Sequence, residues 1–375
     1  MILLNIELDN ILGFSGFSMN LTYPKKVVRS FIEGEWLEGR PNFRYKKAVV
    51  LMGANATGKT SLGKAIQGIF ALLSEMDGAD LFAMVPVGEK ARFSVDFVNV
   101  GYLLHRVTGE ILSSRSDRNK RTSMVKLYYT AADITQKDSY ETCALRLTKE
   151  TPRVFDAQNL EELSMLLGKT NTVFSCPEVK PTASIQHLDA SLVLRVLRAV
   201  IGTLDPTLKD ISQSKDLRNS FIIRRNREEI IIQEGKLLNR EALSSGTAEG
   251  VDIAFFMALL MGGENGFYYC DEHFSYIQSD IEKRIFGLMI DHLRPNEQLI
   301  FTTHNADMLD LNLPKHAFAF LRKRAEENYR VSVIFASEIL KRNTDSVHCA
   351  LENDMFDSIP DDSLLDALEK ENGDE

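Results

Sequence analysis

Hydrophobic residues recur along the chain at two spacings, one typical of strands and one typical of helices. Alternating or short apolar runs predict strands at residues 1–21 (broken at Gly13 and Gly16), 48–52, 91–108, 123–147, 220–238 (a hairpin), 266–270, 298–303 and 331–335. Apolar residues three and four positions apart predict helices at residues 60–76, 160–208, 247–261 and 279–292. This mixture predicts an α/β fold. No heptad pattern persists beyond a few turns, so no long coiled coil is expected.

The acidic residues are concentrated at the C-terminal end of the chain. The formal net charge is −9, and residues 351–375 contain ten acidic side chains against one basic side chain, Lys370. The other 350 residues balance at 43 basic and 43 acidic side chains. The body of the protein is therefore neutral, and its charge does not exclude nucleic acid as a partner.

Several classes of protein are disfavoured by what the sequence lacks. Its cysteines stand far apart, and no CxxC, HExxH or HxH motif suggests a disulfide framework or a protein-ligated metal. No apolar stretch approaches the roughly 18 residues of a membrane-spanning helix. The N-terminus has no basic region of the kind that begins a signal peptide. We therefore expect a cytoplasmic protein without a membrane partner.

One motif points directly to nucleotide binding. Residues 53–60, GANATGKT, match the pattern GxxxxGK[ST] between an apolar strand and an amphipathic helix. Glycines there let backbone N–H groups converge on phosphates, and the start of the helix favours anions. Lys59 would reach the β- and γ-phosphates, and the Thr60 hydroxyl would ligate Mg²⁺. The alternative, a glycine turn that only caps a helix, is disfavoured by the flanking elements.

Three later segments are ambiguous when each is taken alone. Asp271 and Glu272 follow a predicted strand, where an aspartate can hold Mg²⁺ and a glutamate can activate water. Residues 243–247, LSSGT, precede an apolar helix, whose start can bind an anion. His304 ends another strand, where it could touch a γ-phosphate. The alternatives are a solvated loop, a plain helix cap and a structural histidine.

The order of the four segments is more specific than any one of them. Over residues 1–75 and about 240–335, the chain resembles the ABC-type ATPase heads of the SMC, RecF, RecN and OLD-like class. The resemblance implies a P-loop NTPase with a mostly parallel core sheet, an antiparallel β-layer and a helical insertion. It makes residues 53–60 the Walker A motif, residues 243–247 the signature, Asp271 the Walker B aspartate and His304 the switch histidine.

The resemblance also implies the roles of individual residues. Lys59, Glu272 and His304 would be catalytic, and Thr60 and Asp271 would hold Mg²⁺. The residues expected to bind ATP are Gly53, Ala54, Asn55, Ala56, Thr57, Gly58, Lys59, Thr60, Ser61, Ser244, Ser245 and Gly246. In this class the signature of one subunit completes the site of another. The implied assembly is a homodimer or higher oligomer around ATP, with slow ATP hydrolysis.

Some positions depart from the pattern of the class. The signature LSSGT differs from the transporter form LSGGQ, which favours soluble heads. Gly13 stands where many relatives have a basic residue, Gln136 is a weak candidate for the Q-loop, and residues 273–277 occupy the place of the D-loop. These departures concern the rate of hydrolysis rather than nucleotide binding.

The motifs divide the expected head into five segments. They are an N-terminal ATPase lobe (1–90), an antiparallel β-layer (91–150), a helical insertion with a hairpin (151–240), a C-terminal ATPase lobe (241–345) and an acidic tail (346–375). The tail is interpreted either as a docking peptide, for a partner or for a basic groove, or as a solubilising segment.

Two functions fit a compact head without an arm. It resembles stand-alone ATPases of bacterial anti-phage systems, such as AriA of PARIS or PtuA of Septu. The ATPase would then be a scaffold and sensor that controls a separate toxin or nuclease, with a phage protein or DNA as trigger. The alternative is a RecF-like DNA-binding ATPase of repair or replication. Its candidate DNA contacts are Arg115, Arg118, Lys120, Arg121, Arg218, Arg224, Arg225 and Arg227.

Overall fold

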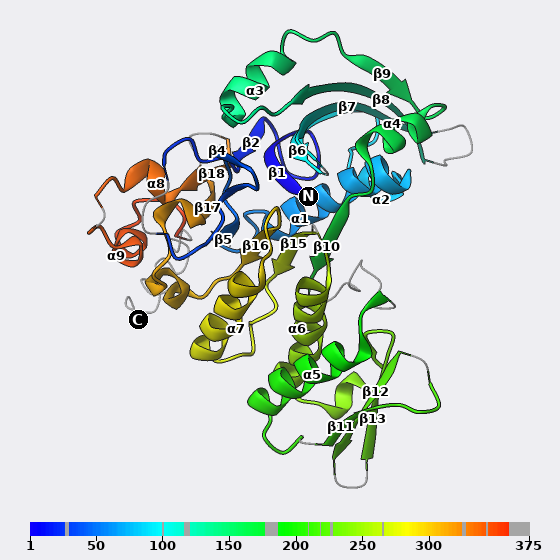
Figure 1. Cartoon of the computed structure of the whole chain (residues 1–375), viewed down its shortest axis with the longest axis vertical. Coiled ribbons are helices and arrows are strands. Elements are labelled where there is room, and N and C mark those ends of the chain that lie inside the picture. The colour runs from blue at the N-terminus through cyan, green and yellow to red at the C-terminus, as the bar shows by residue number, and fades with distance from the viewer. Residues whose placement is uncertain are drawn as a thin grey trace, which may run out of the picture.

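The structure is a computed structural model of the chain. It describes residues 1–26, 30–99, 101–115, 121–176, 187–208, 210–217, 219–225, 228–264, 266–324, 328–342 and 344–359. Within this part, two six-stranded sheets form the upper and middle layers of the molecule, and a four-stranded sheet lies below them (Figure 1). A two-stranded ribbon pairs β3 (Trp36–Leu37) with β4 (Arg40–Arg44).

The upper sheet is antiparallel, with the order β2-β1-β6-β7-β8-β9. Its strands are β1 (Ile2–Asp9), β2 (Phe17–Asn20), β6 (Lys90–Val98), β7 (Leu103–Arg115), β8 (Arg121–Asp133) and β9 (Arg153–Asp156). The first two strands come from the alternating N-terminal segment, and the break between them contains Gly13 and Gly16 as expected.

The middle sheet is the core of the fold, with the order β10-β15-β16-β5-β17-β18. Its strands are β5 (Ala48–Met52), β10 (Asn171–Ser175), β15 (Gly266–Asp271), β16 (Gln298–Thr302), β17 (Phe318–Lys323) and β18 (Val331–Phe335). All neighbours are parallel except β17 and β18. The carboxyl ends of β5, β15 and β16 therefore lie at one edge, where ligands bind in open α/β sheets.

Successive residues of β5 point to opposite faces of this sheet. Val49 and Leu51 join the apolar core shared with the antiparallel sheet and α1 (Lys59–Phe70). Val50 and Met52 join a second core on the other face, which includes α6 (Ser245–Gly262). Helix α1 thus lies between the two large sheets, while α6 and α7 (Ser279–His292) cover the far face of the core sheet (Figure 1).

The remaining helices are α2 (Ala79–Ala83), α3 (Tyr140–Leu147), α4 (Leu160–Leu167), α5 (Ala190–Leu204), α8 (Ala336–Ile339) and α9 (Val347–Glu352), and α1 continues into a π-helical turn at Ala71–Glu75. The longest helix of the described residues is α6, with 18 residues, so the expected absence of a long coiled-coil arm holds for this part of the chain. No helix among the described residues is long and apolar enough to cross a membrane.

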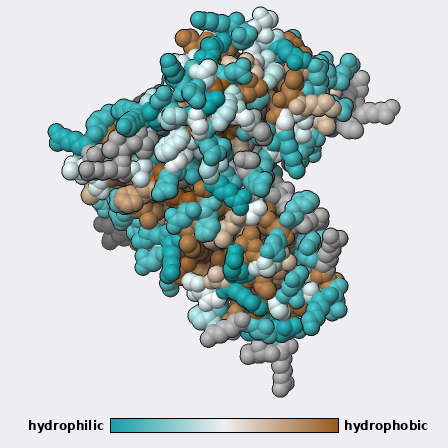
Figure 2. All heavy atoms as spheres, viewed as in Figure 1, coloured by the Kyte–Doolittle hydropathy of each residue, from teal (hydrophilic) through white to brown (hydrophobic). Residues whose placement is uncertain are grey.

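Helix α5 and the third sheet form a lower lobe beneath α6. The sheet has the order β11-β12-β13-β14, with strands β11 (Asp210–Gln213), β12 (Ser220–Arg225), β13 (Glu228–Gln233) and β14 (Lys236–Leu237). The pairing of β12 with β13 is the predicted hairpin. Figure 2 shows that the outline of the molecule narrows between this lobe and the upper layers, and that hydrophilic side chains cover much of the face in view.

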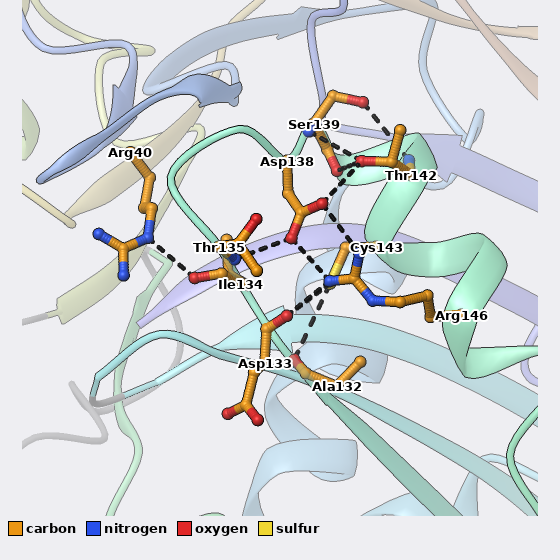
Figure 3. Close-up of polar contacts among 10 residues, drawn as sticks. All are labelled: Arg40, Ala132, Asp133, Ile134, Thr135, Asp138, Ser139, Thr142, Cys143 and Arg146. Carbon is orange, nitrogen blue, oxygen red and sulfur yellow. Dashed lines mark hydrogen bonds and ion pairs between the residues drawn. The ribbon is translucent and has the colours of Figure 1, made fainter.

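Two predicted elements are wrong in part. The stretch 123–147, expected to be a strand, leaves the sheet after Asp133 and becomes α3. Figure 3 shows the reason: Asp138 accepts hydrogen bonds from the Thr135 N–H (2.8 Å) and from both ends of the Arg146 guanidinium (2.8 and 2.6 Å). Ser139 and Thr142 form a capping box that starts the helix. Gln136, the Q-loop candidate, lies in this turn.

The second error concerns residues 160–208, which were expected to be helical throughout. Helix α4 ends at Leu167 and is capped by Gly168, whose φ of +69° is left-handed, and residues 171–175 then form β10. This strand pairs with β15 and completes the edge of the core sheet. The segment 151–240 therefore contributes β9 to the upper sheet and β10 to the core. Strand β17, next to β5, had no predicted counterpart.

The close packing of α1 on the core sheet gives a stability prediction. A Cβ at Gly63 would lie 2.2 Å from the Phe174 ring and 2.7 Å from the Tyr269 ring. We expect Gly63→Ala to lower the free energy of unfolding by about 1–3 kcal/mol, since overpacking outweighs the better helix propensity of alanine. The matched control is Gly287→Ala in α7, where a Cβ would have no neighbour within 4 Å. Denaturant unfolding should show that this control is not destabilised; equal loss in both variants would contradict the packing argument.

Candidate nucleotide site

The loop that follows β5 has a backbone that requires glycine. Gly53 has φ +151° and Gly58 has φ +106°, both outside the range of ordinary side chains. A Cβ at Gly53 would lie 2.6 Å from the carbonyl oxygen of Leu321 in β17. Gly58 precedes α1, and the Phe14 ring packs against it, 3.3 Å from where its Cβ would be. The loop thus keeps its amides at the start of the helix, free of side-chain bulk.

Lys59 begins α1 and points back over the loop. Its Nζ donates a hydrogen bond to the carbonyl oxygen of Gly53 (2.8 Å) and lies 3.2 Å from Oε1 of Glu272. Lys59 is buried, and this burial lowers the pKa of its ammonium, while the nearby Glu272 carboxylate opposes the shift. The lysine therefore holds a charge at the mouth of the loop through contacts that a phosphate can replace.

A chain of oxygen atoms links α1 to the ends of two strands. The Thr60 hydroxyl donates to Oδ2 of Asp271 (2.6 Å), and the Thr302 hydroxyl donates to Oδ1 (2.7 Å). Asp271 is almost fully buried at the end of β15. Burial raises the pKa of Asp271, and the two hydroxyl donors lower it. A hydroxyl and a carboxylate held together in this way suit a hard cation such as Mg²⁺.

Glu272 lies between the side chains of Lys59 and His304. Its Oε1 is 2.9 Å from Nε2 of His304 and 3.2 Å from Nζ of Lys59. The hydrogen bond from His304, opposed by burial and assisted by Lys59, lowers the pKa of Glu272 to about 2. The backbone of Glu272 is left-handed (φ +49°), and its N–H donates to the Thr302 hydroxyl (3.1 Å). Such a strained conformation is frequent at active sites.

The signature segment is placed at the start of α6. Ser244 is the N-cap, and its hydroxyl accepts a hydrogen bond from the Thr247 N–H (3.3 Å). A Cβ at Gly246 would lie 2.8 Å from the carbonyl oxygen of Tyr276, which follows Glu272 by four residues. The N–H of Tyr276 in turn faces Glu249 (3.4 Å). The signature is therefore packed against the segment that follows Glu272 in the chain.

His273 is the first residue of the segment 273–277, which was interpreted as occupying the place of the D-loop, and its side chain is buried. Its Nε2 lies 2.7 Å from the Ser175 hydroxyl at the end of β10. Burial lowers the pKa of this imidazole to about 4, so it is neutral at physiological pH. Tyr276, by contrast, is 69% exposed. The segment thus anchors itself on the core sheet through His273 and offers an aromatic side chain to the surface.

Two contributing residues were not among the predicted site residues. Thr302 bridges Asp271 and the backbone of Glu272, and Lys323 donates from its Nζ to the carbonyl oxygen of Ala56 in the loop (2.6 Å). Thr302 precedes His304 in the TTH segment, so its position was available in the sequence. Lys323 gave no signal because β17 itself was not predicted. The structure places the predicted site residues on the loop after β5, at the start of α1, at and just after the end of β15, just after β16 and at the start of α6.

The residues present fit a magnesium–nucleotide. A glycine loop at a helix start, a buried lysine above it and a hydroxyl–carboxylate pair beside it provide for phosphates and for a cation. Together with the parallel core sheet and the antiparallel layer, this arrangement defines the molecule as a P-loop ATPase head of the ABC type.

Comparison with known proteins places the chain more narrowly. It belongs to the family described as "AAA domain, putative AbiEii toxin, Type IV TA system", whose model matches residues 48–310. No curated protein matches the chain.

Comparison with solved structures finds SMC heads and RecF. The SMC head bound to the C-winged helix domain of ScpA is 14% identical, with a TM-score of 0.50, over 91% of this chain and 100% of that chain. An SMC head with a coiled coil from Pyrococcus furiosus is 14% identical, with a TM-score of 0.46, over 94% and 98%. The recombination mediator RecF is 12% identical, with a TM-score of 0.40, over 88% and 98%. At 14% identity, the similarity to the ScpA-bound SMC head supports the fold of this chain and nothing about its function.

Proposed function

We propose that this protein binds and hydrolyses ATP, dimerises around it, and serves as the scaffold and sensor of a bacterial anti-phage system that controls a separate toxin or nuclease. The observation that carries the ATPase part is the convergence of Lys59, Glu272 and His304 beside the glycine loop. The family description, which names a toxin–antitoxin system, supports a role next to a toxic effector.

Glu272 is the candidate base for hydrolysis. In the structure its carboxylate is a weak proton acceptor, because His304 and Lys59 both stabilise its charge. When Lys59 turns to the phosphates, Glu272 loses its lysine neighbour and its pKa rises. It can then accept a proton from the attacking water, while His304 remains beside it. Thr60 and Asp271 would hold Mg²⁺, which neutralises phosphate charge when bound.

The second copy would complete the site. Ser244 and the free N–H groups at the start of α6 make an anion-binding helix end. Supplied from a neighbouring chain, this end would stabilise charge on the γ-phosphate during hydrolysis. ATP would therefore favour the dimer, and hydrolysis would favour its dissociation. An effector that binds only one of these two states would then be controlled by the nucleotide.

The effector is tested by co-purification with the tagged protein from its native cells, with and without ATP. We expect a second protein of toxin or nuclease type to be recovered, and more of it with ATP. Recovery of the tagged chain alone under both conditions would contradict effector control.

The acidic tail is tested in the same experiment. The deletion should begin at Pro360, because Phe356 is buried on Phe320 (ring centroids 4.0 Å) and belongs to the fold. If the tail is the docking peptide, this deletion removes the second protein while Glu162→Gln, at an exposed position of α4, retains it. Unchanged recovery would leave the tail a solubilising segment.

The described residues give no support to the DNA-binding alternative. Arg224 pairs with Glu229 (2.9 Å) and Asp210 (3.6 Å), and Arg225 pairs with Glu228 (3.5 Å). These arginines are therefore neutralised within their own sheet. The side chains of the other candidates, Arg115, Arg118, Lys120, Arg121, Arg218 and Arg227, lie outside the described part of the structure. Duplex binding that weakens steeply with salt would favour the alternative.

A further inference from the structure

We propose that Glu282 of α7 is a positioning residue for the switch histidine: its buried carboxylate holds the two residues on either side of His304 and so fixes where His304 meets Glu272. The inference rests on the proposed ATPase function and names a residue outside the four sequence motifs.

The contacts of Glu282 are made by both of its oxygens. Oε1 accepts a hydrogen bond from the Thr303 hydroxyl (2.7 Å), and Oε2 accepts one from the Asn305 side-chain amide (2.7 Å). Glu282 is only 2% exposed. A buried carboxylate with two donors is costly to leave unpaired, so its geometry constrains both partners.

The loop that carries His304 is braced from inside as well. The Asn305 N–H donates to the Thr303 hydroxyl (3.0 Å), and the Asn305 amide also donates to the Ser279 hydroxyl (2.9 Å). Ser279 and Glu282 are three residues apart on α7, a spacing that places both on one helix face. One face of α7 thus binds the loop at two points, while His304 between them projects to Glu272.

The charges around Glu282 are consistent with this role. Burial raises the pKa of Glu282, the hydrogen bonds from Thr303 and Asn305 lower it, and Asp307 and Lys283 act in opposite directions. Asp307 is occupied by the Ser279 hydroxyl (2.6 Å), and Lys283 by Asp280 (3.1 Å). No cationic side chain is paired with Glu282 among the described residues. Its hydrogen-bonding capacity is therefore directed to the loop.

Helix α7 also connects this loop to the catalytic carboxylate along the chain. Only residues 273–278 separate Glu272 from the start of α7. A shift of α7 would consequently displace Glu272 and the His304 loop together. By holding the loop to α7, Glu282 keeps His304 at a fixed position relative to Glu272.

The test is a double-mutant cycle on ATP hydrolysis with Glu282→Gln and His304→Ala. Glutamine keeps the size of glutamate, but its NH₂ group would face either the Thr303 hydroxyl or the Asn305 amide, both of which donate to Glu282. We expect Glu282→Gln to lower kcat by about 10- to 100-fold with KM for ATP changed less than about 2-fold, because a small misplacement acts on the chemical step. In the His304→Ala background the same substitution should have almost no further effect. Equal losses in both backgrounds would overturn the proposal.

The matched control is Glu297→Gln, another buried glutamate that accepts hydrogen bonds, here from the Arg294 and Gly266 N–H groups at the opposite end of the core strands. It should lower the melting temperature without an effect on kcat that depends on His304. A measurement independent of hydrolysis is the histidine-selective NMR spectrum, in which Glu282→Gln should move the His304 ring signals. An unmoved signal overturns the inference even if the chain hydrolyses no ATP, whereas an inactive wild type with a moved signal counts only against the proposed function.

Discussion

Glu272→Gln should abolish ATP turnover while ATP binding persists and dimers accumulate. The amide has nearly the shape of the carboxylate but cannot accept a proton from water, so kcat should fall at least about 100-fold. The substitution also removes the negative charge that faces Lys59 at 3.2 Å. The lysine is then released to the phosphates, and affinity for ATP should be retained or improved.

Three measurements check this expectation: phosphate release, binding of a fluorescent ATP analogue, and mass by light scattering with saturating Mg·ATP. Glu162→Gln is the control, since that glutamate pairs with Arg153 on the surface of α4. A variant that hydrolyses ATP as fast as the wild type would remove Glu272 from the mechanism. A variant that binds ATP and stays monomeric would contradict the dimer.

Lys59→Ala should lose ATP binding itself. The ammonium is held over the glycine loop in a buried position, where a contact with a phosphate is poorly screened by water. We expect the Kd for ATP to rise by about 100-fold or more, which corresponds to about 3 kcal/mol. No ATP-dependent dimer should then form.

Calorimetric titration with Mg·ATP measures this loss directly. The matched control is Lys64→Ala, an exposed lysine on the same helix, which should bind ATP as the wild type does. If Lys59→Ala binds ATP with unchanged Kd, the glycine loop is not the nucleotide site. Equal loss of ATP affinity in both variants would indicate a general effect of charge rather than a specific contact of Lys59.

Much of the core could be predicted because its strands and helices are long, strongly apolar and followed by recognisable motifs. Strands β5, β15 and β16 and helix α7 fall within a residue or two of the expected bounds. Strand β10 could not be identified, since its five residues include only two large apolar side chains, Val173 and Phe174, and show no period that separates a strand from a helix. Helix α3 was missed because its start depends on the Asp138 and Ser139 contacts rather than on apolar spacing.

The sequence also predicted which residues would form the candidate site, but it did not predict which of them contact one another. Lys59 and Glu272 are 213 positions apart and meet only because the sheet order places β16 between β15 and β5. The sheet order itself is not encoded in any local pattern. For the same reason, the roles of Thr302 and Lys323 emerge only when the ends of β16 and β17 are placed next to the loop.

The lower lobe is joined to the signature by a stiff connection. Helices α5 and α6 approach so closely that a Cβ at Gly250 would lie 2.3 Å from Leu204, and one at Gly262 would lie 3.0 Å from Leu192. Gly250 lies in the first half of α6 and Gly262 at its end, so the two helices are packed along most of α6 and move as one body rather than sliding past each other. Ser244 caps the same α6. Any tilt of the lower lobe would therefore also move Ser244, the residue proposed to contact the nucleotide of a neighbouring chain.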